Sequence, residues 1–275
     1  MLPAVGHLLV TNDDGVDSPA LRPLLRALSA LRTVRAVVPD RERSWIGKAI
    51  TRWEKLQVRQ VPGTEIYTSD GFPADCAQLG IHALAVERPD LVVSGINIGL
   101  NYGSSFFLSS GTVGAAIESW IAGVPAVAFS IGDPTNDRDW KAEARTDEWL
   151  PRWRRAAAAC AEIVAEILHG GYPEGCDLLS VNMPLGAGPD TPRVVTELAH
   201  VRYPALFRHE GGGTYAHHFA GQITAQASTS VTDVAAVGEG RISITPVTLV
   251  RSAQMSSDDV ARLCGTRARR SKAGS

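Results

Sequence analysis

The chain contains no apolar run of membrane-spanning length, and its first residues carry no leader pattern. No stretch approaches the roughly 20 apolar residues that a membrane helix needs. Residues 1–4, Met-Leu-Pro-Ala, lack a basic segment followed by an apolar one, which is the mark of a secretory signal peptide. We therefore expect a cytoplasmic protein without a membrane partner.

Cysteine is scarce and shows no ligand spacing. The four cysteines stand far apart, and none belongs to the CxxC pattern of zinc sites and redox motifs: Cys76, Cys160, Cys176 and Cys264. Because most of them lie in apolar surroundings, we expect buried thiols rather than disulfides or zinc ligands.

An excess of charge is also missing. The net charge of −2 at pH 7 creates no basic field that would attract a nucleic-acid polymer. A basic tail, residues 265–275, is interpreted as a solvated chain end. Hydrophobic residues at 44% and charged residues at 20% are typical of a globular protein. We expect one α/β domain over residues 1–275, with its core in about residues 1–184.

What the chain does have is an alternation of short apolar runs and helical patterns. Residues 7–11 and 34–38 are predicted to be buried parallel strands. Leucines at 21, 24, 25 and 28 predict a helix between them, with Ser18 as its N-cap and Pro19 as its first residue. Helices are further predicted at residues 73–86 and 112–122, and a long alanine-rich helix is predicted to end at about residue 168. Strands are predicted at residues 91–93, 126–129 and 178–181. This order indicates a doubly wound, mostly parallel sheet.

Two segments depart from this alternation. Residues 55–60 and 65–69 alternate like a hairpin around Pro62 and Gly63. From about Pro184 onward, turn residues, the glycine run 211–213 and strand-like pieces at 223–227 and 242–244 predict an extended arm. Because such an arm buries little of itself, we expect residues 185–260 to pack on another subunit or to fold back over the sheet.

Polar residues gather directly after three of the predicted strands, where ligands bind in open α/β sheets. Asp13 and Asp14 follow the first strand, Ser44 ends the polar run after the second, and Asn97 follows the strand at 91–93. Adjacent carboxylates stay ionised together only with a cation or strong donors between them. Such oxygens suit Mg²⁺, Mn²⁺ or Ca²⁺, and Ser44 and Asn97 could complete the shell. The alternative is that Asp13 and Asp14 only cap a helix and form an Asx turn.

A second polar feature lies at a predicted helix start. Residues 109–116 place Ser110, Gly111 and Thr112 where free backbone N–H groups, hydroxyls and the helix dipole make an anion site. An ordinary Ser/Thr N-cap is the alternative. The presence of a metal-ligand set on the same rim of the sheet favours a phosphate site.

Two other phosphate-handling classes are disfavoured by spacing. A dinucleotide-binding site needs GxGxxG after the first strand, and the chain has Thr-Asn-Asp-Asp-Gly there. A covalent aspartyl-phosphate enzyme needs two acids separated by one residue, and Asn12 occupies the position of its nucleophile.

Taken in order, six blocks resemble the SurE family of metal-dependent 5′/3′-nucleotidases: residues 8–19, 38–44, 71–76, 89–97, 110–116 and 123–126. Weaker similarity continues at 180–184 and 232–246. The resemblance implies a Rossmann-like fold and one divalent ion per subunit, Mg²⁺ or Mn²⁺, on Asp13, Asp14, Ser44 and Asn97. It also implies hydrolysis of nucleoside 5′- and 3′-monophosphates, with short polyphosphate as a further substrate. Family members are homodimers or homotetramers, held partly by swapped C-terminal elements.

From this resemblance we expect a phosphatase in which Asp13 or Asp14 accepts the proton of the attacking water. Ser110, Gly111 and Thr112 would hold the phosphoryl oxygens, and Asn12 and Asn101 would donate further hydrogen bonds. A non-catalytic nucleotide-binding regulator on the same fold is the alternative.

The chain departs from the family pattern around the expected site. Trp45 replaces a common glycine, Phe72 replaces a threonine, and Ser109 replaces a tyrosine after a segment, 102–108, without the usual acid. We expect these departures to change substrate preference. Three histidines of the arm could bind zinc, although solvated surface histidines are the commoner case: His209, His217 and His218.

Overall fold

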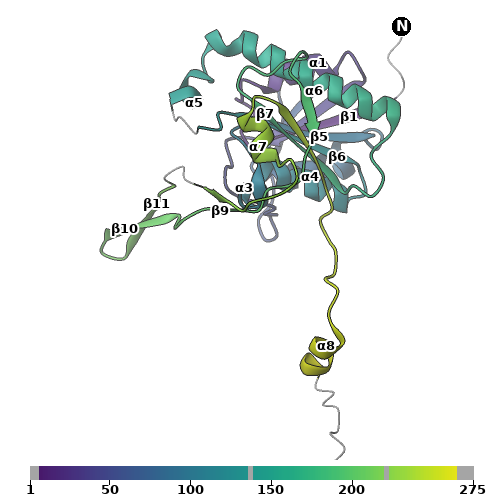
Figure 1. The fold of residues 1–275 in the computed structure, drawn as a ribbon. Helices are drawn as coiled ribbons and strands as arrows, with labels where there is room; N and C mark the ends of the chain where they lie inside the picture. Colours follow the sequence, from purple (N-terminus) through teal and green to yellow (C-terminus); the bar gives the residue numbers. More distant parts are fainter. Residues whose placement is uncertain (1–5, 136–138, 220–222, 265–275) are drawn as a thin grey trace, which may run out of the picture.

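A nine-stranded sheet forms the centre of the computed structural model, which describes residues 6–135, 139–219 and 223–264 (Figure 1). Its strand order is β3-β4-β2-β1-β5-β6-β7-β13-β8. The strands are β1 (His7–Thr11), β2 (Thr33–Pro39), β3 (Val58–Gln60), β4 (Ile66–Ser69), β5 (Leu91–Ile98), β6 (Ala126–Gly132), β7 (Leu178–Pro184), β8 (Arg193–Val195) and β13 (Ile242–Val247). The six neighbours from β4 to β7 are parallel, whereas β3 and β13 run antiparallel to β4 and β7. The predicted fold class is confirmed.

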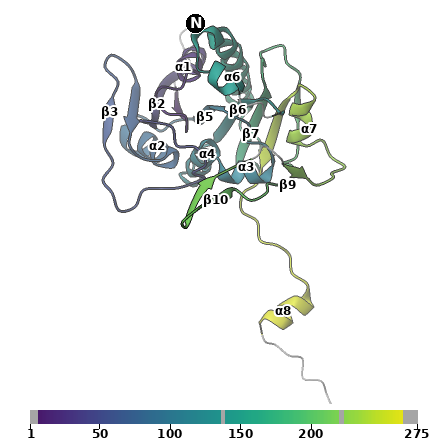
Figure 2. The ribbon, with the colours of Figure 1, turned by 90° about the vertical axis from the view of Figure 1, so that its left-hand side faces the viewer.

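Helices cover both faces of the sheet (Figure 2). One face carries α1 (Leu21–Leu28) and α6 (Leu150–Gly170), and the other carries α2 (Pro73–Leu79) and α4 (Gly111–Ile121). The shorter helices are a π-helical turn (Gly80–Leu84), α3 (Gly103–Ser109), α5 (Asp139–Glu143), a 3₁₀ turn (Asp147–Trp149), α7 (Asp233–Gly238) and α8 (Ser257–Leu263). In the described part of the chain, no helix is long and apolar enough to cross a membrane.

The predicted start of the first helix was wrong. The helix α1 begins at Leu21 with Ala20 at its N-cap, and the buried hydroxyl of Ser18 has no hydrogen-bond partner among the described residues. Two successive turns precede the helix, because Ser18 N donates to Gly15 O at 3.2 Å and Leu21 N donates to Ser18 O at 3.1 Å. A serine–proline pair is compatible with turns as well as with a helix start, so the pattern alone did not separate the two.

The strand predicted at residues 91–93 is longer than expected. It runs as β5 from Leu91 to Ile98, with a register shift against β6 between Ser94 and Asn97. Asn97 therefore lies near the end of the strand itself rather than in the following loop. Its side chain still lies at the carboxyl end of the sheet.

The segment expected as an arm divides into two parts. The strand predicted at 242–244 is β13, which pairs with β7 over five positions inside the main sheet. Outside the sheet, β10 (Phe207–Gly211) and β11 (Thr214–His217) form a projecting hairpin, and β9 (Val201–Arg202) pairs with β12 (Thr224–Ala225) at its base (Figure 1). The basic tail 265–275 lies outside the described residues.

Candidate functional site

Two buried carboxylates lie at the carboxyl end of β1. Asp13 and Asp14 are 3% and 6% exposed. Asp14 Oδ2 accepts a hydrogen bond from Ile98 N at 3.0 Å, which ties it to the end of β5. Asp13 Oδ1 accepts from Thr112 Oγ1 at 2.5 Å, which ties it to the start of α4. The two acids are thus held in place by elements about 85 and 100 residues away in sequence.

Burial makes this pair of acids difficult to ionise before a cation binds. Burial raises the pKa of Asp13 to about 6, although hydrogen bonds from Thr112 oppose the shift. Burial, followed by the charge of Asp13, raises the pKa of Asp14 to about 8. A divalent cation beside both carboxylates would reverse this effect, because it favours the ionised form of each.

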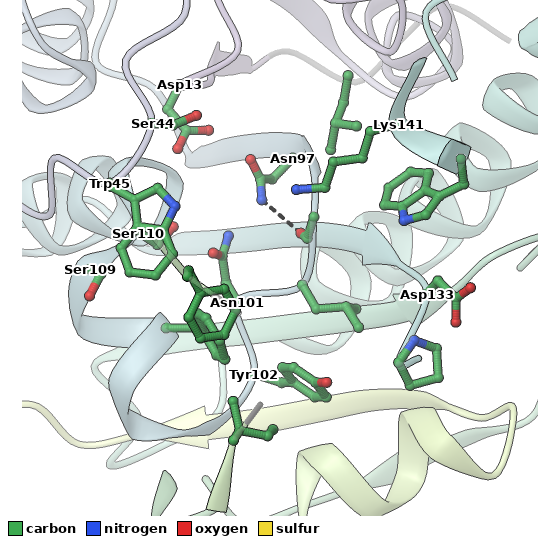
Figure 3. A pocket seen from close by; sticks show the side chains of 18 of the residues that line it. Asp13, Ser44, Trp45, Asn97, Asn101, Tyr102, Ser109, Ser110, Asp133 and Lys141 are labelled. Atoms are coloured by element: carbon green, nitrogen blue, oxygen red, sulfur yellow. Dashed lines mark hydrogen bonds between the residues drawn. The ribbon is translucent and has the colours of Figure 1, made fainter. Parts of the chain in front are cut away.

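The other two predicted ligands lie in the same cleft as Asp13 (Figure 3). The loop that carries Ser44 is attached to the end of β1, because Arg43 N donates to Asp13 O at 2.7 Å. Ser44 Oγ donates to Glu42 Oε1 at 2.7 Å, and Asn97 Nδ2 donates to Gly99 O at 2.7 Å. Asn97 therefore keeps its side-chain oxygen for a ligand.

The donor set fits a hard divalent cation. Among the described residues, no three His, Cys, Asp or Glu side chains lie together as a metal-binding group. A cation at this point would depend on two carboxylates completed by the neutral oxygens of Ser44 and Asn97. Such an all-oxygen set is typical of Mg²⁺ and Mn²⁺ rather than zinc.

The start of α4 faces Asp13. Ser110 caps the helix by accepting from Val113 N at 3.1 Å, and it lines the cleft. A Cβ at Gly111 would lie 2.8 Å from Cβ of Asp13, so only glycine allows the helix to approach this closely. Thr112 is fully buried and donates to Asp13. Of the three predicted phosphate-binding residues, Ser110 borders the cleft, whereas Gly111 and Thr112 position the carboxylate.

The two predicted asparagines differ in placement. The amide of Asn12 closes a turn: Nδ2 donates to Gly15 O at 3.0 Å, and Oδ1 accepts from Gly15 N at 3.1 Å. Asn12 is fully buried and does not border the cleft. Asn101 does border it, with Nδ2 donating to Ser130 Oγ at 2.8 Å. Asn12 thus holds the turn that presents the acids, and Asn101 faces the ligand space.

One positively charged side chain in the cleft was not predicted from the sequence. Lys141 of α5 lines it, and its ammonium group lies beside Asn97 and Gly99 (Figure 3). Nearby, Arg145 pairs with Glu42 at 2.9 Å, and Glu42 in turn accepts from Ser44. The segment after β6 is therefore joined to the loop of Ser44. The strand-end rule that selected the other residues applies equally to β6 and would have directed attention there.

The departures from the family pattern are distributed unevenly over the site. Trp45 and Ser109 line the cleft, which has a volume of about 520 Å³. Phe72 does not line it; the ring of Phe72 lies 5.7 Å from the guanidinium of Arg43. Two of the three arm histidines, His217 and His218, border the cleft, whereas His209 packs on the ring of Tyr215.

Fold and site together define an open α/β protein with an acidic, oxygen-rich ligand site at the carboxyl ends of its central strands. The family model described as "Survival protein SurE" matches residues 8–205. A protein from Methanocella arvoryzae named 5′-nucleotidase SurE is 35% identical, with 94% of this chain and 97% of that protein covered. Another of the same name from Methanothrix thermoacetophila is 37% identical, with 92% and 97% covered.

A solved structure has the same fold. The crystal structure of the SurE protein from Aquifex aeolicus superimposes with a TM-score of 0.69 at 32% identity, and it covers 94% of this chain and 98% of that one. The chain belongs to the SurE family. The resemblance predicted from the six sequence blocks is thereby confirmed.

Proposed function

We propose that the protein is a divalent-metal-dependent phosphatase that hydrolyses nucleoside 5′-monophosphates. The observation that carries this proposal is the buried pair Asp13 and Asp14, of which Asp13 lines a cleft together with Ser44 and Asn97. The relatives named 5′-nucleotidase support the same activity. Nucleoside 3′-monophosphates and short polyphosphate are further proposed substrates, because they present the same terminal phosphoryl group.

One ion per subunit, Mg²⁺ or Mn²⁺, would be held by Asp13, Asp14, Ser44 and Asn97. When bound, the ion polarises the phosphoryl group and lowers the pKa of a water molecule. The residues of the chain position these reactants. Thr112 and Gly111 fix Asp13, and Asn12 fixes the turn that contains the two acids.

Other residues would bind the phosphoryl group itself. Ser110 and Asn101 border the cleft and offer hydrogen bonds to its oxygens, and Lys141 offers a positive charge. Either Asp13 or Asp14 would accept the proton of the attacking water, because the two carboxylates are the bases of the proposed ligand shell.

A homodimer or homotetramer is proposed from the projecting hairpin. Phe207 on β10 and Tyr215 on β11 are each 63% exposed, so the projecting hairpin offers aromatic surface that a second subunit would cover. A cytoplasmic location stays a prediction from the sequence.

Activity of the purified protein on nucleoside monophosphates tests the function. Release of phosphate is measured with added Mg²⁺ or Mn²⁺, after removal of the metal with a chelator, and after its return. We expect turnover that disappears with the chelator and recovers with the metal. Binding of nucleotide without turnover under every metal would instead support the non-catalytic regulator.

A further inference from the structure

An aromatic wall forms one side of the cleft. It consists of four of the aromatic side chains that line the cleft: Trp45, Tyr102, Phe106 and Phe219. They come from the loop after β2, from the start of α3 and from the segment after β11. Residues from distant parts of the chain thus converge on one surface.

Trp45 is at the centre of this wall. Its ring lies 5.9 Å from that of Phe106, 5.9 Å from that of Phe219 and 5.1 Å from that of His217. These contacts leave Trp45 41% exposed. A large part of the indole surface is therefore available to a ligand in the cleft.

The backbone holds Trp45 in an unusual conformation. Its φ of 57° lies in the left-handed region, which bulky residues rarely adopt and glycine adopts freely. The loop is fixed on α3 and α4. Gly47 N donates to Ser109 O at the end of α3 at 2.9 Å, and a Cβ at Gly114 of α4 would meet Gly47 O at 2.3 Å. A strained residue on an anchored loop indicates that the ring has a role at this place.

We propose that the aromatic wall stacks on the base of the nucleotide whose phosphate binds at the Asp13 end of the cleft. The inference rests on the proposed function and specifies how that site recognises a base. Trp45 directly follows Ser44, so the wall begins at the metal end, and Tyr102 lies at the opposite side of the cleft from Asp13 (Figure 3). A volume of about 520 Å³ lies within the range of small-molecule sites, and every base offers a π face to such a wall.

The competing explanation is that the rings only attach the C-terminal segment to the core. Tyr203 fits that explanation, since it contacts Trp45 and Phe106 but does not line the cleft. The four wall residues do line it. Because their rings border the space in which a ligand would bind, a stacking role is favoured.

The test compares substrates with and without a base. Steady-state kinetics are measured with AMP and with ribose 5-phosphate at saturating Mn²⁺, for wild type, Trp45→Gly and Trp45→Phe. Trp53→Gly is the matched control, because Trp53 is 82% exposed and does not line the cleft. Trp45→Gly suits the left-handed backbone, and circular dichroism verifies its fold.

Loss of a stacking partner costs roughly 5- to 150-fold in affinity. We expect Trp45→Gly to raise KM for AMP within that range, and to leave kcat for AMP and both constants for ribose 5-phosphate within about twofold. Trp45→Phe should have a KM for AMP close to that of wild type. Trp53→Gly should leave the constants for both substrates unchanged.

Equal losses on AMP and ribose 5-phosphate would overturn the inference in favour of a packing role. No change on either substrate would overturn it as well. If wild type hydrolyses neither compound, the proposed function fails. The stacking inference is then tested separately by calorimetric titration of AMP into wild type and Trp45→Gly. Equal AMP affinity of wild type and Trp45→Gly would then overturn it.

Discussion

The two sides of the cleft are built in different ways. On the acidic side, Asp13 and Asp14 are almost fully buried and are held by hydrogen bonds from β5 and α4. On the aromatic side, Trp45 is 41% exposed and is held by ring contacts with residues from the C-terminal segment. The central sheet therefore fixes the chemical groups, whereas a loop and a peripheral segment form the surface that would meet the rest of the substrate.

The largest effect is expected on the acidic side from Asp14→Asn. A metal supplies several kcal/mol of transition-state stabilisation, so its loss should lower kcat by about 10³-fold or more. Asp17→Asn is the matched control, because Asp17 is an exposed acid of the same loop. Phosphate release by the two variants measures the difference. Normal turnover by Asp14→Asn would remove the acidic side from the mechanism.

A smaller effect is expected from Thr112→Val, which removes the hydroxyl that donates to Asp13. Groups that orient a metal ligand typically contribute 10- to 100-fold to metal affinity or activity, so we expect a loss of about that size. Ser119→Ala is the control on the same helix, since the Ser119 hydroxyl donates to Ala115 O within that helix. Titration of Mn²⁺ into each protein by calorimetry compares them. Unchanged affinity in Thr112→Val would show that Asp13 needs no support from α4.

The pH dependence of stability should also separate the two sides. The folded pKa values of Asp13 and Asp14, about 6 and about 8, lie above the ordinary value of 3.8. Between pH 3.8 and about pH 8 these two acids bind more protons in the folded protein than in the unfolded one. Their contribution to stability is therefore fully present below about pH 4 and is lost as the pH rises to about 8. Each unit of pKa shift corresponds to about 1.4 kcal/mol, and Tm should fall by at least about 5 °C up to pH 8.

This decline is measured by thermal unfolding of the metal-free protein. Mn²⁺ should offset it, with the larger rise in Tm at the higher pH, because the ion binds the ionised carboxylates. Asp14→Asn should flatten the curve. A curve of the same slope in that variant would assign the dependence to other groups.

The smallest effect is expected from Lys141→Met. Lys141 is exposed at the edge of the cleft, so solvent screens its charge, and its loss should raise KM by only about 3- to 10-fold. Lys55→Met is the control, since Lys55 is exposed outside the cleft. The difference between the variants should shrink at high salt. A difference that persists in high salt would point to a direct hydrogen bond rather than to a field effect.

The sequence predicted the acidic side better than the aromatic side. Parallel strands end at one edge, so the strand-end rule located Asp13 and Asp14, whereas the family resemblance was needed to choose Asn97 among its neighbours. The rule did not establish how the side chains are oriented. Thr112 was predicted to bind phosphate, but its hydroxyl donates to Asp13. The aromatic wall joins Trp45 with Phe106 and Phe219, which only the tertiary fold brings together.

The C-terminal part shows a similar limit. The apolar pattern of β13 indicated a strand but not its neighbours, so its place between β7 and β8 could not be derived from the sequence. The strand-end rule points to the polar segment after β6, but that segment has no helical or strand period, so no local pattern distinguished Lys141 from its neighbours.

The central claim is that Asp13 and Asp14 hold one divalent ion in each subunit. Calorimetric titration of Mn²⁺ into the metal-stripped full-length protein tests it most directly, with the double variant Asp13→Asn/Asp14→Asn measured beside wild type. We predict one site per subunit in wild type and none in the variant. Equal binding by both proteins would contradict the account.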